Sequence, residues 1–393
     1  MKRTLSLAIL LSIGGQGYAA EWGIGFNADP GFKYDDNELL REDKEGDFSL
    51  NITPTLSLSR KLENSLSQIQ LGYRISRYDR LSELDKENPF FSFSTSKSTE
   101  RSTYGLNFNY SERESRSIAE EDTADFSNTS TTTTKSISPS FSYRLTELDT
   151  VSTTLSYQKR LQSTASNNSL LANSSNLTNN ETKSLNLAWQ HQYSERLSGG
   201  VSVGYVNYQA ESNNLDNEYD SYTAGFTSTY QLTELWAVSG LLGARYLNSE
   251  NNLSNGITST DTSSGLNYSF SATKKDELDS ITLSASRSLV PSSEGDVNEQ
   301  DAYTLSYSRA LTEKLNVNLS SSYREYTSAD DINSNTTKYI DFSPNLRWKL
   351  YEEWSFVFGY RYRSIDESDG KNVNSNAVTF NIDYNWDGIH FSR

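Results

Sequence analysis

Apolar and polar side chains alternate with a period of two residues along most of the chain from Glu21 onward. In the segment 184–193, Leu185, Leu187 and Trp189 share one face, while the opposite face is mostly polar. Such alternation is typical of β-strands that have one apolar and one wet face. No apolar run of about 18 residues follows the N-terminus, so the sequence provides no transmembrane helix. We therefore expect an all-β fold.

The first residues have the pattern of an export signal. Lys2 and Arg3 form a short basic region, and an apolar segment follows over residues 5–13. Small residues at Gly17 and Ala19 suit a cleavage site after Ala19. The sequence therefore predicts a signal peptide over residues 1–19 and an exported domain over residues 20–393.

The composition excludes several classes of function. The formal charge is −16, which disfavours nucleic-acid binding because that function needs a basic surface. The chain has no Cys and only two His, so disulfide scaffolds, thiolate metal sites and Ser–His catalysis lack their residues. His191 falls on an apolar face, and His390 lies beyond the last expected strand. We predict that the protein is not an enzyme and has no catalytic residue, metal site or cofactor.

Short turns that carry glutamate recur along the chain, and each joins two alternating segments. Longer segments rich in Ser, Thr, Asn and Asp separate these hairpins. Short turns at one end and long loops at the other are typical of bacterial outer-membrane barrels, with the turns periplasmic and the loops extracellular. The expected turns are Lys61–Asn64, Ser111–Glu114, Leu145–Leu148, Ser194–Leu197, Leu232–Leu235, Asp276–Leu278, Leu311–Leu315 and Leu350–Glu353.

The hairpins set the expected number of strands. Eight hairpins, with a first strand at Trp22–Tyr34 and a last at Asn376–Trp386, give about 18 strands. Alternation is poor in the strand around Arg113–Ala119, so 16 strands is the alternative. A soluble β-sandwich, a β-helix or a repetitive adhesin would also alternate, but none of these needs such regular hairpins. The sequence therefore predicts a transmembrane antiparallel β-barrel over residues 20–393, located in the cell outer membrane.

Tryptophan positions support a membrane boundary near the short turns. Five of the six Trp residues lie beside a short turn or at a chain end, and all five fall on the apolar face. Amphipathic rings of this kind prefer the membrane–water interface. We expect an aromatic girdle on the periplasmic side that consists of Trp22, Trp236, Trp348, Trp354 and Trp386.

Two features do not fit a regular barrel. Prolines inside expected strands would each remove a ladder hydrogen bond. Either β-bulges near the periplasmic rim accommodate them, or these strands start later than expected. The polar segment 79–101 contains three Phe residues, and this expected loop could fold into the pore as a constriction, bind a partner, or extend the barrel wall above the membrane. Acidic segments such as Asp35–Asn37 are expected to be solvated. The residues concerned are Pro54, Pro139 and Pro344, and Phe90, Phe91 and Phe93.

Small hydroxylated side chains dominate the face that would line the lumen. Examples are Ser57 and Ser59 on one strand and Ser284 and Ser286 on another, so the expected lining is mostly neutral. A barrel of this size leaves an aqueous channel, and such a lining suits hydroxyl-rich solutes.

Five arginines also fall on the inward face, in the halves of the strands far from the short turns. They could form a cationic ring that attracts anions or acidic sugars. Alternatively, they pair with acidic loop residues or with phosphates of the outer leaflet. These candidates are Arg74, Arg160, Arg245, Arg324 and Arg361.

Two stretches carry a family resemblance. Tyr34–Asn37 with Gly46–Arg60, and Ser286–Gly295 with Tyr303–Leu311, resemble hairpins of outer-membrane β-barrel proteins encoded with exopolysaccharide biosynthesis systems and of the related barrels of PEP-CTERM sorting systems. This resemblance implies an outer-membrane location and a link to polysaccharide export. It implies polysaccharide and periplasmic export components as partners, beside outer-membrane lipid and lipopolysaccharide. It provides no catalytic residue.

Three functions remain open from the sequence. The first is an outer-membrane channel associated with exopolysaccharide export, which the small hydroxylated lumen and the resemblance favour. The second is a general or solute-specific porin for uptake, which the same lumen permits. The third is a structural barrel whose acidic loops bind partners at the surface.

Overall fold

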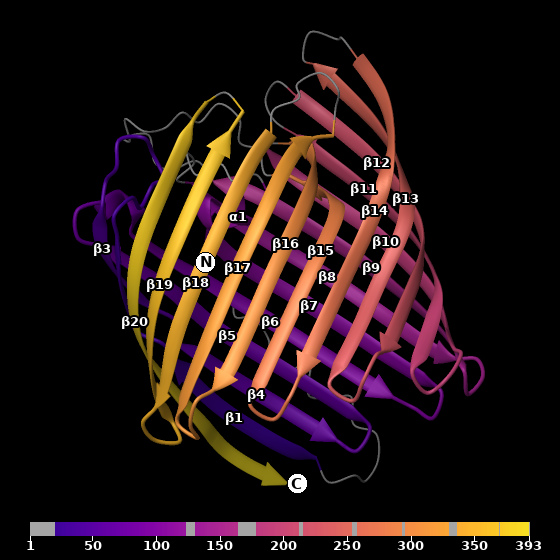
Figure 1. Ribbon diagram of the computed structural model, residues 1–393, viewed down its shortest axis with the longest axis horizontal. Helices are drawn as coiled ribbons and strands as arrows, with labels where there is room; N and C mark the ends of the chain where they lie inside the picture. The colour runs from indigo at the N-terminus through magenta and orange to yellow at the C-terminus, as the bar shows by residue number, and fades with distance from the viewer. Residues whose placement is uncertain are drawn as a thin grey trace, which may run out of the picture.

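The computed structural model describes residues 20–122, 130–163, 178–211, 215–253, 258–292, 295–329, 336–368 and 370–392. The expected signal segment 1–19 lies outside these residues. The described chain forms one antiparallel sheet in which each strand from β4 onward pairs with the next, and β1 pairs with both β4 and β20 to close the barrel (Figure 1). The alternation of the sequence therefore produces the predicted closed wall.

The barrel has 18 strands, as predicted, because β1 continues into β2 and β3 continues into β4. The first segments are β1 (Glu21–Ala28), β2 (Gly31–Asp35), β3 (Asp47–Ile52), β4 (Thr55–Leu62), β5 (Ser65–Tyr78), β6 (Lys86–Ser98), β7 (Ser102–Glu114), β8 (Thr131–Arg144), β9 (Asp149–Ser163) and β10 (Asn179–Gln192). The others are β11 (Leu197–Glu211), β12 (Leu215–Gln231), β13 (Trp236–Leu253), β14 (Thr258–Lys275), β15 (Asp279–Pro291), β16 (Val297–Ala310), β17 (Leu315–Ser328), β18 (Thr336–Lys349), β19 (Trp354–Glu367) and β20 (Asn372–Ser392).

Two short helices interrupt this pattern, η2 (Ser82–Leu84) between β5 and β6, and α1 (Ser115–Asp122) after β7. No described helix is long and apolar enough to cross a membrane.

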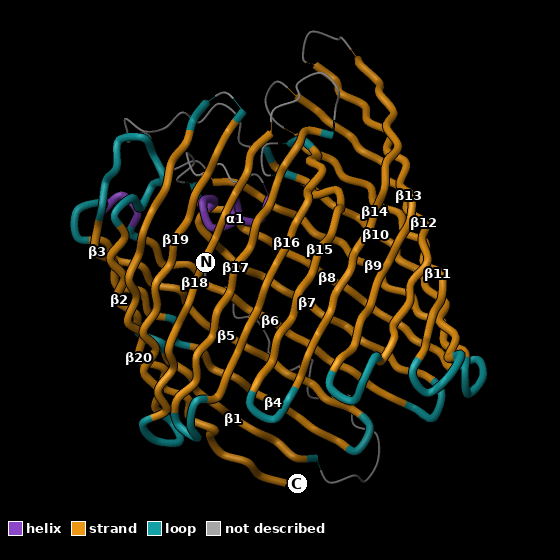
Figure 2. Tube along the Cα trace, in the orientation of Figure 1, coloured by secondary structure: helices purple, strands orange, loops and turns teal. Residues whose placement is uncertain are grey.

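Short turns lie at one end of the barrel and longer connections at the other (Figure 2). The predicted turn at Ser111–Glu114 is wrong, because these residues continue β7. The true turn is Thr99–Arg101, between β6 and β7. The expected loop 79–101 is correspondingly short, and its phenylalanines belong to β6. The adjacent Phe90 and Phe91 interrupt the simple alternation, and this misled the prediction.

The prolines do not cause the bulges that we expected. Leu106 pairs with Pro139 in an unbroken β7–β8 register, and the β8–β9 register is the same on both sides of a two-residue gap. Pro344 occupies an equivalent gap between β18 and β19. Pro54 separates β3 from β4, again with no change of register against β5. Pro139 and Pro344 therefore open the ladder on one side only, whereas at Pro54 the pairing is interrupted on both sides.

A bulge does occur in β20. The register between β1 and β20 shifts between two consecutive pairs, Ile24 with Ile389 and Phe26 with Trp386. Gly388 has a φ of 78°, and a Cβ atom there would lie 1.4 Å from the Ile24 carbonyl oxygen, so only glycine fits. The strand continues to Ser392. His390 therefore belongs to the wall, rather than to a tail as we expected.

Large apolar side chains are exposed on the outer face. Phe226 is 74% exposed and Leu242 is 62% exposed, which is the arrangement of a wall that contacts lipid. Buried apolar residues occur instead in small clusters among the long-loop connections. The lumen face of the described strands is polar, so the described part of the barrel has no continuous hydrophobic core.

The connection between β2 and β3, residues 36–46, folds into the barrel. Leu40 packs with Tyr339 and Ile365, whose side chains face the lumen on β18 and β19. Leu39 packs with Leu84 of η2. These contacts fix the connection, which we call the inner loop, inside the long-loop end. The solvated segment that we expected at Asp35–Asn37 is therefore wrong, because Asp35 and Asn37 are buried.

The sheet is incomplete between β14 and β15. β14 pairs with β13 over Thr258–Lys274 but with β15 only over Tyr268–Lys275. We call this gap the seam. Side chains bridge it: Arg245 of β13 forms an ion pair with Glu299 of β16. Tyr268 donates a hydrogen bond of 3.2 Å to Asp301 of β16.

The strands β11–β14 extend beyond the rest of the wall on one side of the seam (Figure 1). Their lumen face contributes Tyr208 and Leu247, which pack with Val297 at the start of β16. The Tyr208 hydroxyl donates a hydrogen bond of 2.8 Å to the Ser292 carbonyl. The connection between β15 and β16 therefore lies against the inner side of this extension.

We predict that Asp35→Asn loosens the inner loop. Arg363 donates a hydrogen bond of 2.7 Å to Asp35, and their side chains are 8% and 1% exposed. Removing one charge of such a buried pair leaves the other uncompensated, which typically costs about 3 kcal/mol or more. Amides of residues 36–46 should exchange hydrogen faster by a corresponding factor.

Asp43→Asn provides the control, since Asp43 is an exposed residue of the same loop. Unchanged exchange in Asp35→Asn would contradict the assignment of this ion pair as the anchor.

Candidate functional site

A cavity of about 310 Å³ lies in the lumen beneath the inner loop, and cationic side chains dominate its lining. We call it the arginine cavity. Its only carboxylates among the lining residues that the structure describes are Glu38 and Glu114. The cations are Lys33 of β2, Arg74 of β5, Arg113 of β7, Arg116 of α1, and Arg361 and Arg363 of β19.

Strand periodicity places most of these side chains in the lumen. On β5, Arg74 and Ser76 face inward, whereas Leu71 and Tyr73 are exposed on the outer face. The same alternation directs Arg361 and Arg363 inward on β19. Arg116 comes instead from α1, which reaches the cavity because it follows β7 directly.

Four of the cations have carboxylate partners. Lys33 donates a hydrogen bond of 2.6 Å to Glu38, and Arg361 donates one of 2.5 Å to Asp341. Arg363 donates to Asp35, as described above. The Lys33–Glu38 pair attaches the inner loop to the wall, whereas the other two pairs join neighbouring parts of the wall.

Arg116 is the fourth of these cations, and its side chain is 7% exposed. It donates a hydrogen bond of 2.9 Å to Glu114 and one of 3.2 Å to the Glu38 carbonyl oxygen. Burial disfavours its charged form, but Glu114, Tyr78 and Glu38 outweigh burial, so the pKa of Arg116 is raised. Arg116 therefore stays cationic.

Arg74 differs because it makes no ion pair with any residue in the described part of the chain. Its guanidinium donates a long hydrogen bond of 3.4 Å to the Glu112 carbonyl oxygen. It lies 4.5 Å from the centre of the Phe90 ring, which is a cation–π distance. Neither contact neutralises the charge, so Arg74 presents a cation to the cavity.

A second cavity, of about 450 Å³, lies on the short-turn side of Phe90, and we call it the serine cavity. Its lining combines small and hydroxylated residues at predicted inward positions with larger residues such as Asp29 and His390. Phe90 lines this cavity and also contacts Arg74, so its ring lies between the two cavities. The lining includes Gly23, Gly25, Thr55, Ser57, Ser59 and Gln70.

The phenylalanines therefore lie in a strand rather than in a loop. Phe90 faces the lumen, whereas Phe91 contacts Phe108 on the outer face, with ring centres 5.7 Å apart. Of the two adjacent rings, only that of Phe90 projects into the lumen, so it alone can narrow the pore.

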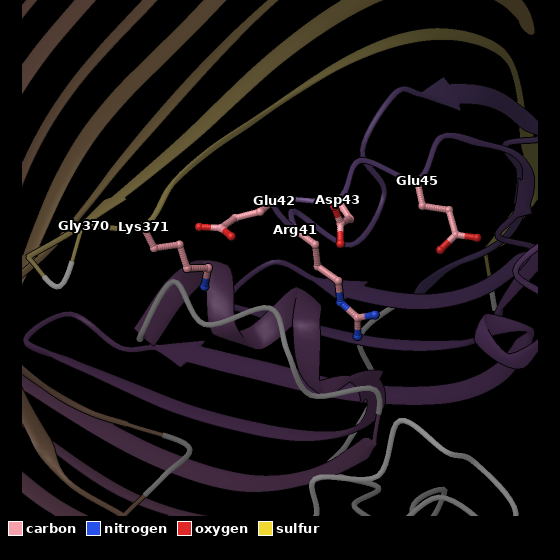
Figure 3. Close-up of a pocket in the computed structure, with 6 residues that line it drawn as sticks. All are labelled: Arg41, Glu42, Asp43, Glu45, Gly370 and Lys371. Atoms are coloured by element: carbon pink, nitrogen blue, oxygen red, sulfur yellow. The ribbon is translucent and has the colours of Figure 1, made fainter.

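A third cavity, of about 640 Å³, opens between the inner loop and the β19–β20 connection. Figure 3 shows Arg41, Glu42, Asp43 and Glu45 of the inner loop, with Lys371 on the opposite side. Charges of both signs lie together here. This entrance therefore provides no single preference for cations or anions, unlike the arginine cavity.

The five predicted lumen arginines do not gather in one cavity. Only Arg74 and Arg361 line the arginine cavity. Arg245 pairs with Glu299 at the seam, and Arg324 lies 6.0 Å from the Tyr339 ring centre. Arg160 occupies an inward position on β9, opposite Asn180 of β10.

Three arginines of the cavity were missed from the sequence. Arg363 shares the inward parity of Arg361, so the alternation of β19 could have identified it. Arg113 was assigned to a turn that does not exist. Arg116 lies in a short helix, and no pattern in the sequence indicated its position.

The predicted girdle residues all lie near the short-turn end. Trp236 and Trp354 are the first residues of β13 and β19, and Trp348 is the penultimate residue of β18. Trp22 contacts Phe391 with ring centres 6.4 Å apart, and Trp386 is 36% exposed. Their contact with the membrane interface stays a prediction.

The structure shows no metal centre in the part of the chain that it describes, where no three His, Cys, Asp or Glu side chains form a group that could hold a metal. His191 lies on the outer face beside Trp189 and contacts Asp149 at 2.8 Å. His390 lines the serine cavity. The two histidines therefore lie on opposite sides of the wall.

Comparison with known proteins identifies the fold but not a family. No protein-family model matches the chain, and no curated protein matches it. The siderophore receptor PiuA from Acinetobacter baumannii is 13% identical, with a TM-score of 0.52, over 94% of this chain and 70% of that one. The FrpB iron transporter from Neisseria meningitidis is 10% identical, with a TM-score of 0.50, over 93% and 82%.

A structure of Pseudomonas aeruginosa OpdK with vanillate is 9% identical, with a TM-score of 0.47, over 94% of this chain and all of that one. At these identities the likeness concerns the fold. The protein is an outer-membrane β-barrel located in the outer membrane. The matches bring no support to the expected link with exopolysaccharide or PEP-CTERM systems.

We predict that Phe90→Ala increases the single-channel conductance. The change removes the aromatic ring between the arginine and serine cavities, so the path between them widens. Phe91→Ala is the matched control, because it removes the neighbouring ring from the outer face. Planar-bilayer recordings should show a larger conductance for Phe90→Ala alone, and equal conductance in both variants would place the narrow point elsewhere.

Proposed function

We propose that the protein is an outer-membrane channel for the uptake of small anionic solutes. The observation that carries this proposal is the arginine cavity, above all Arg74, which has a half-buried charge and no carboxylate partner among the described residues. A cleft lined by one sign of charge concentrates ions of the opposite sign. A solute with a carboxylate or phosphate would be attracted there.

The size of the cavity supports a small solute. Its volume of about 310 Å³ is at the lower end of ligand-binding pockets. The serine cavity beyond Phe90 offers hydroxyl and amide groups but few cations. Conduction requires sites that attract a solute and then release it. An anion would therefore be held by the arginines and released into the serine cavity, whose described lining includes one carboxylic acid, Asp29, and no Lys or Arg.

Exopolysaccharide export is the second candidate, and it rests on the sequence resemblance and on the hydroxylated lining of the serine cavity. The uptake proposal is preferred because the inner loop and its ion pairs divide the lumen into small cavities. Neither function requires a catalytic residue, and we propose no enzymatic role.

We predict that Arg74→Gln lowers the preference for anions. Coulomb attraction of a unit charge at 4 Å is worth about 1 kcal/mol even in water, so the chloride-to-potassium permeability ratio should fall by roughly fivefold. Reversal potentials in planar bilayers under a salt gradient measure this ratio.

Arg77→Gln is the matched control for this measurement. Arg77 lies on the same strand, faces outward and pairs with Glu87. A wild-type channel that prefers cations, or a barrel that does not conduct, would overturn the uptake proposal. Reduced surface polysaccharide in a deletion strain would favour the second candidate instead.

A further inference from the structure

Three lysines lie on adjacent strands of the outer face at the long-loop end. Lys135 of β8, Lys159 of β9 and Lys183 of β10 form what we call the lysine patch. Lys135 and Lys183 are exposed, and the Lys159 side chain is 39% exposed. All three have the outward parity of their strands.

The lysine patch marks the upper border of the apolar outer face. Two residues closer to the short turns, the same side of each strand carries Ile137, Tyr157 and Leu185. Ile137 is 41% exposed and Tyr157 is 37% exposed. In a membrane, these apolar residues contact acyl chains, and the lysines therefore reach the level of the lipid headgroups.

The positive charges of the lysine patch are only partly compensated within the protein. Lys135 and Lys159 are directly opposite each other across the β8–β9 pair. Like charges in this position destabilise a sheet. One carboxylate, Glu181, pairs with Lys159, and neither Lys135 nor Lys183 makes an ion pair within the described chain. An external anion would offset this repulsion.

Other cations at the same border are arranged differently. Arg77 pairs with Glu87, and Arg287 pairs with Asp301 on the neighbouring strand. Lys338 is directly opposite Glu325 on one side and Asp366 on the other. The concentration of positive charge is therefore local to β8–β10.

We propose that the lysine patch binds the phosphorylated headgroup of an outer-leaflet glycolipid of the lipopolysaccharide type. A phosphate group carries between one and two negative charges at neutral pH, and three ammonium groups on one face can share it. The acyl chains of the same molecule lie along Ile137, Tyr157 and Leu185. A soluble anion would contact the lysines but not the apolar residues beside them, so the geometry favours a lipid.

The test measures binding of diphosphorylated lipid A to the purified full-length barrel in detergent micelles. A triple variant, Lys135→Gln, Lys159→Gln and Lys183→Gln, should bind it at least about tenfold more weakly, because each lysine near an anionic lipid surface contributes roughly fivefold. The control triple variant is Lys274→Gln, Lys338→Gln and Lys349→Gln, which changes the charge equally elsewhere. Heat-modifiable migration in gels verifies that each variant is folded.

A second probe distinguishes the headgroup from the acyl chains. Dephosphorylated lipid A should bind the wild type about as weakly as diphosphorylated lipid A binds the triple variant. A triple replacement of the lysines by arginine should restore binding.

The proposal is overturned if both triple variants bind equally, or if the wild type does not distinguish the two lipids. It is also overturned if excess inorganic phosphate fully displaces the lipid, since the site would then recognise the free ion. None of these outcomes depends on conduction through the lumen.

Discussion

The closed hydrogen-bonded wall is the constraint on which the remaining structure depends. Backbone groups within a bilayer have no water to satisfy them, so the strands must pair with each other and close. Once β1 pairs with β20, the side chains along each strand point alternately to the outside of the barrel and into the lumen. The apolar exterior, the hydroxylated lining and the inward arginines all follow from this separation.

Within that wall, the inner loop turns a wide lumen into separate cavities. Leu39 and Leu40 of the loop pack into two different apolar clusters, and Glu38 binds Lys33 of the wall. Asp35, the residue of β2 just before the loop, binds Arg363. Apolar contacts thus determine where the loop lies, and ion pairs determine which charges remain available. Arg74 is left with no carboxylate because the acidic residues of the loop engage other cations.

The periodic parts of the fold could be predicted from the sequence, and the interior could not. Alternation and turn residues predicted the number of strands and the serine lining, because both depend on local pattern. The prediction failed where that pattern was broken, as at Phe90 and Phe91, which are adjacent but face opposite sides. Arg116 and Leu40 reach the site through connections whose path depends on tertiary packing, and a period-two pattern carries no information about it.

The seam has a mechanical consequence for the whole cylinder. Elsewhere, separating two neighbours means breaking a ladder that extends along most of a strand. Between β14 and β15, backbone hydrogen bonds connect the strands only in the half near the short turns. In the half near the long loops, a few side-chain contacts, such as the Arg245–Glu299 ion pair, connect the two sides of the seam. When heat, detergent or mechanical force destabilises the barrel, these side-chain contacts break first, and strand separation then spreads from the seam.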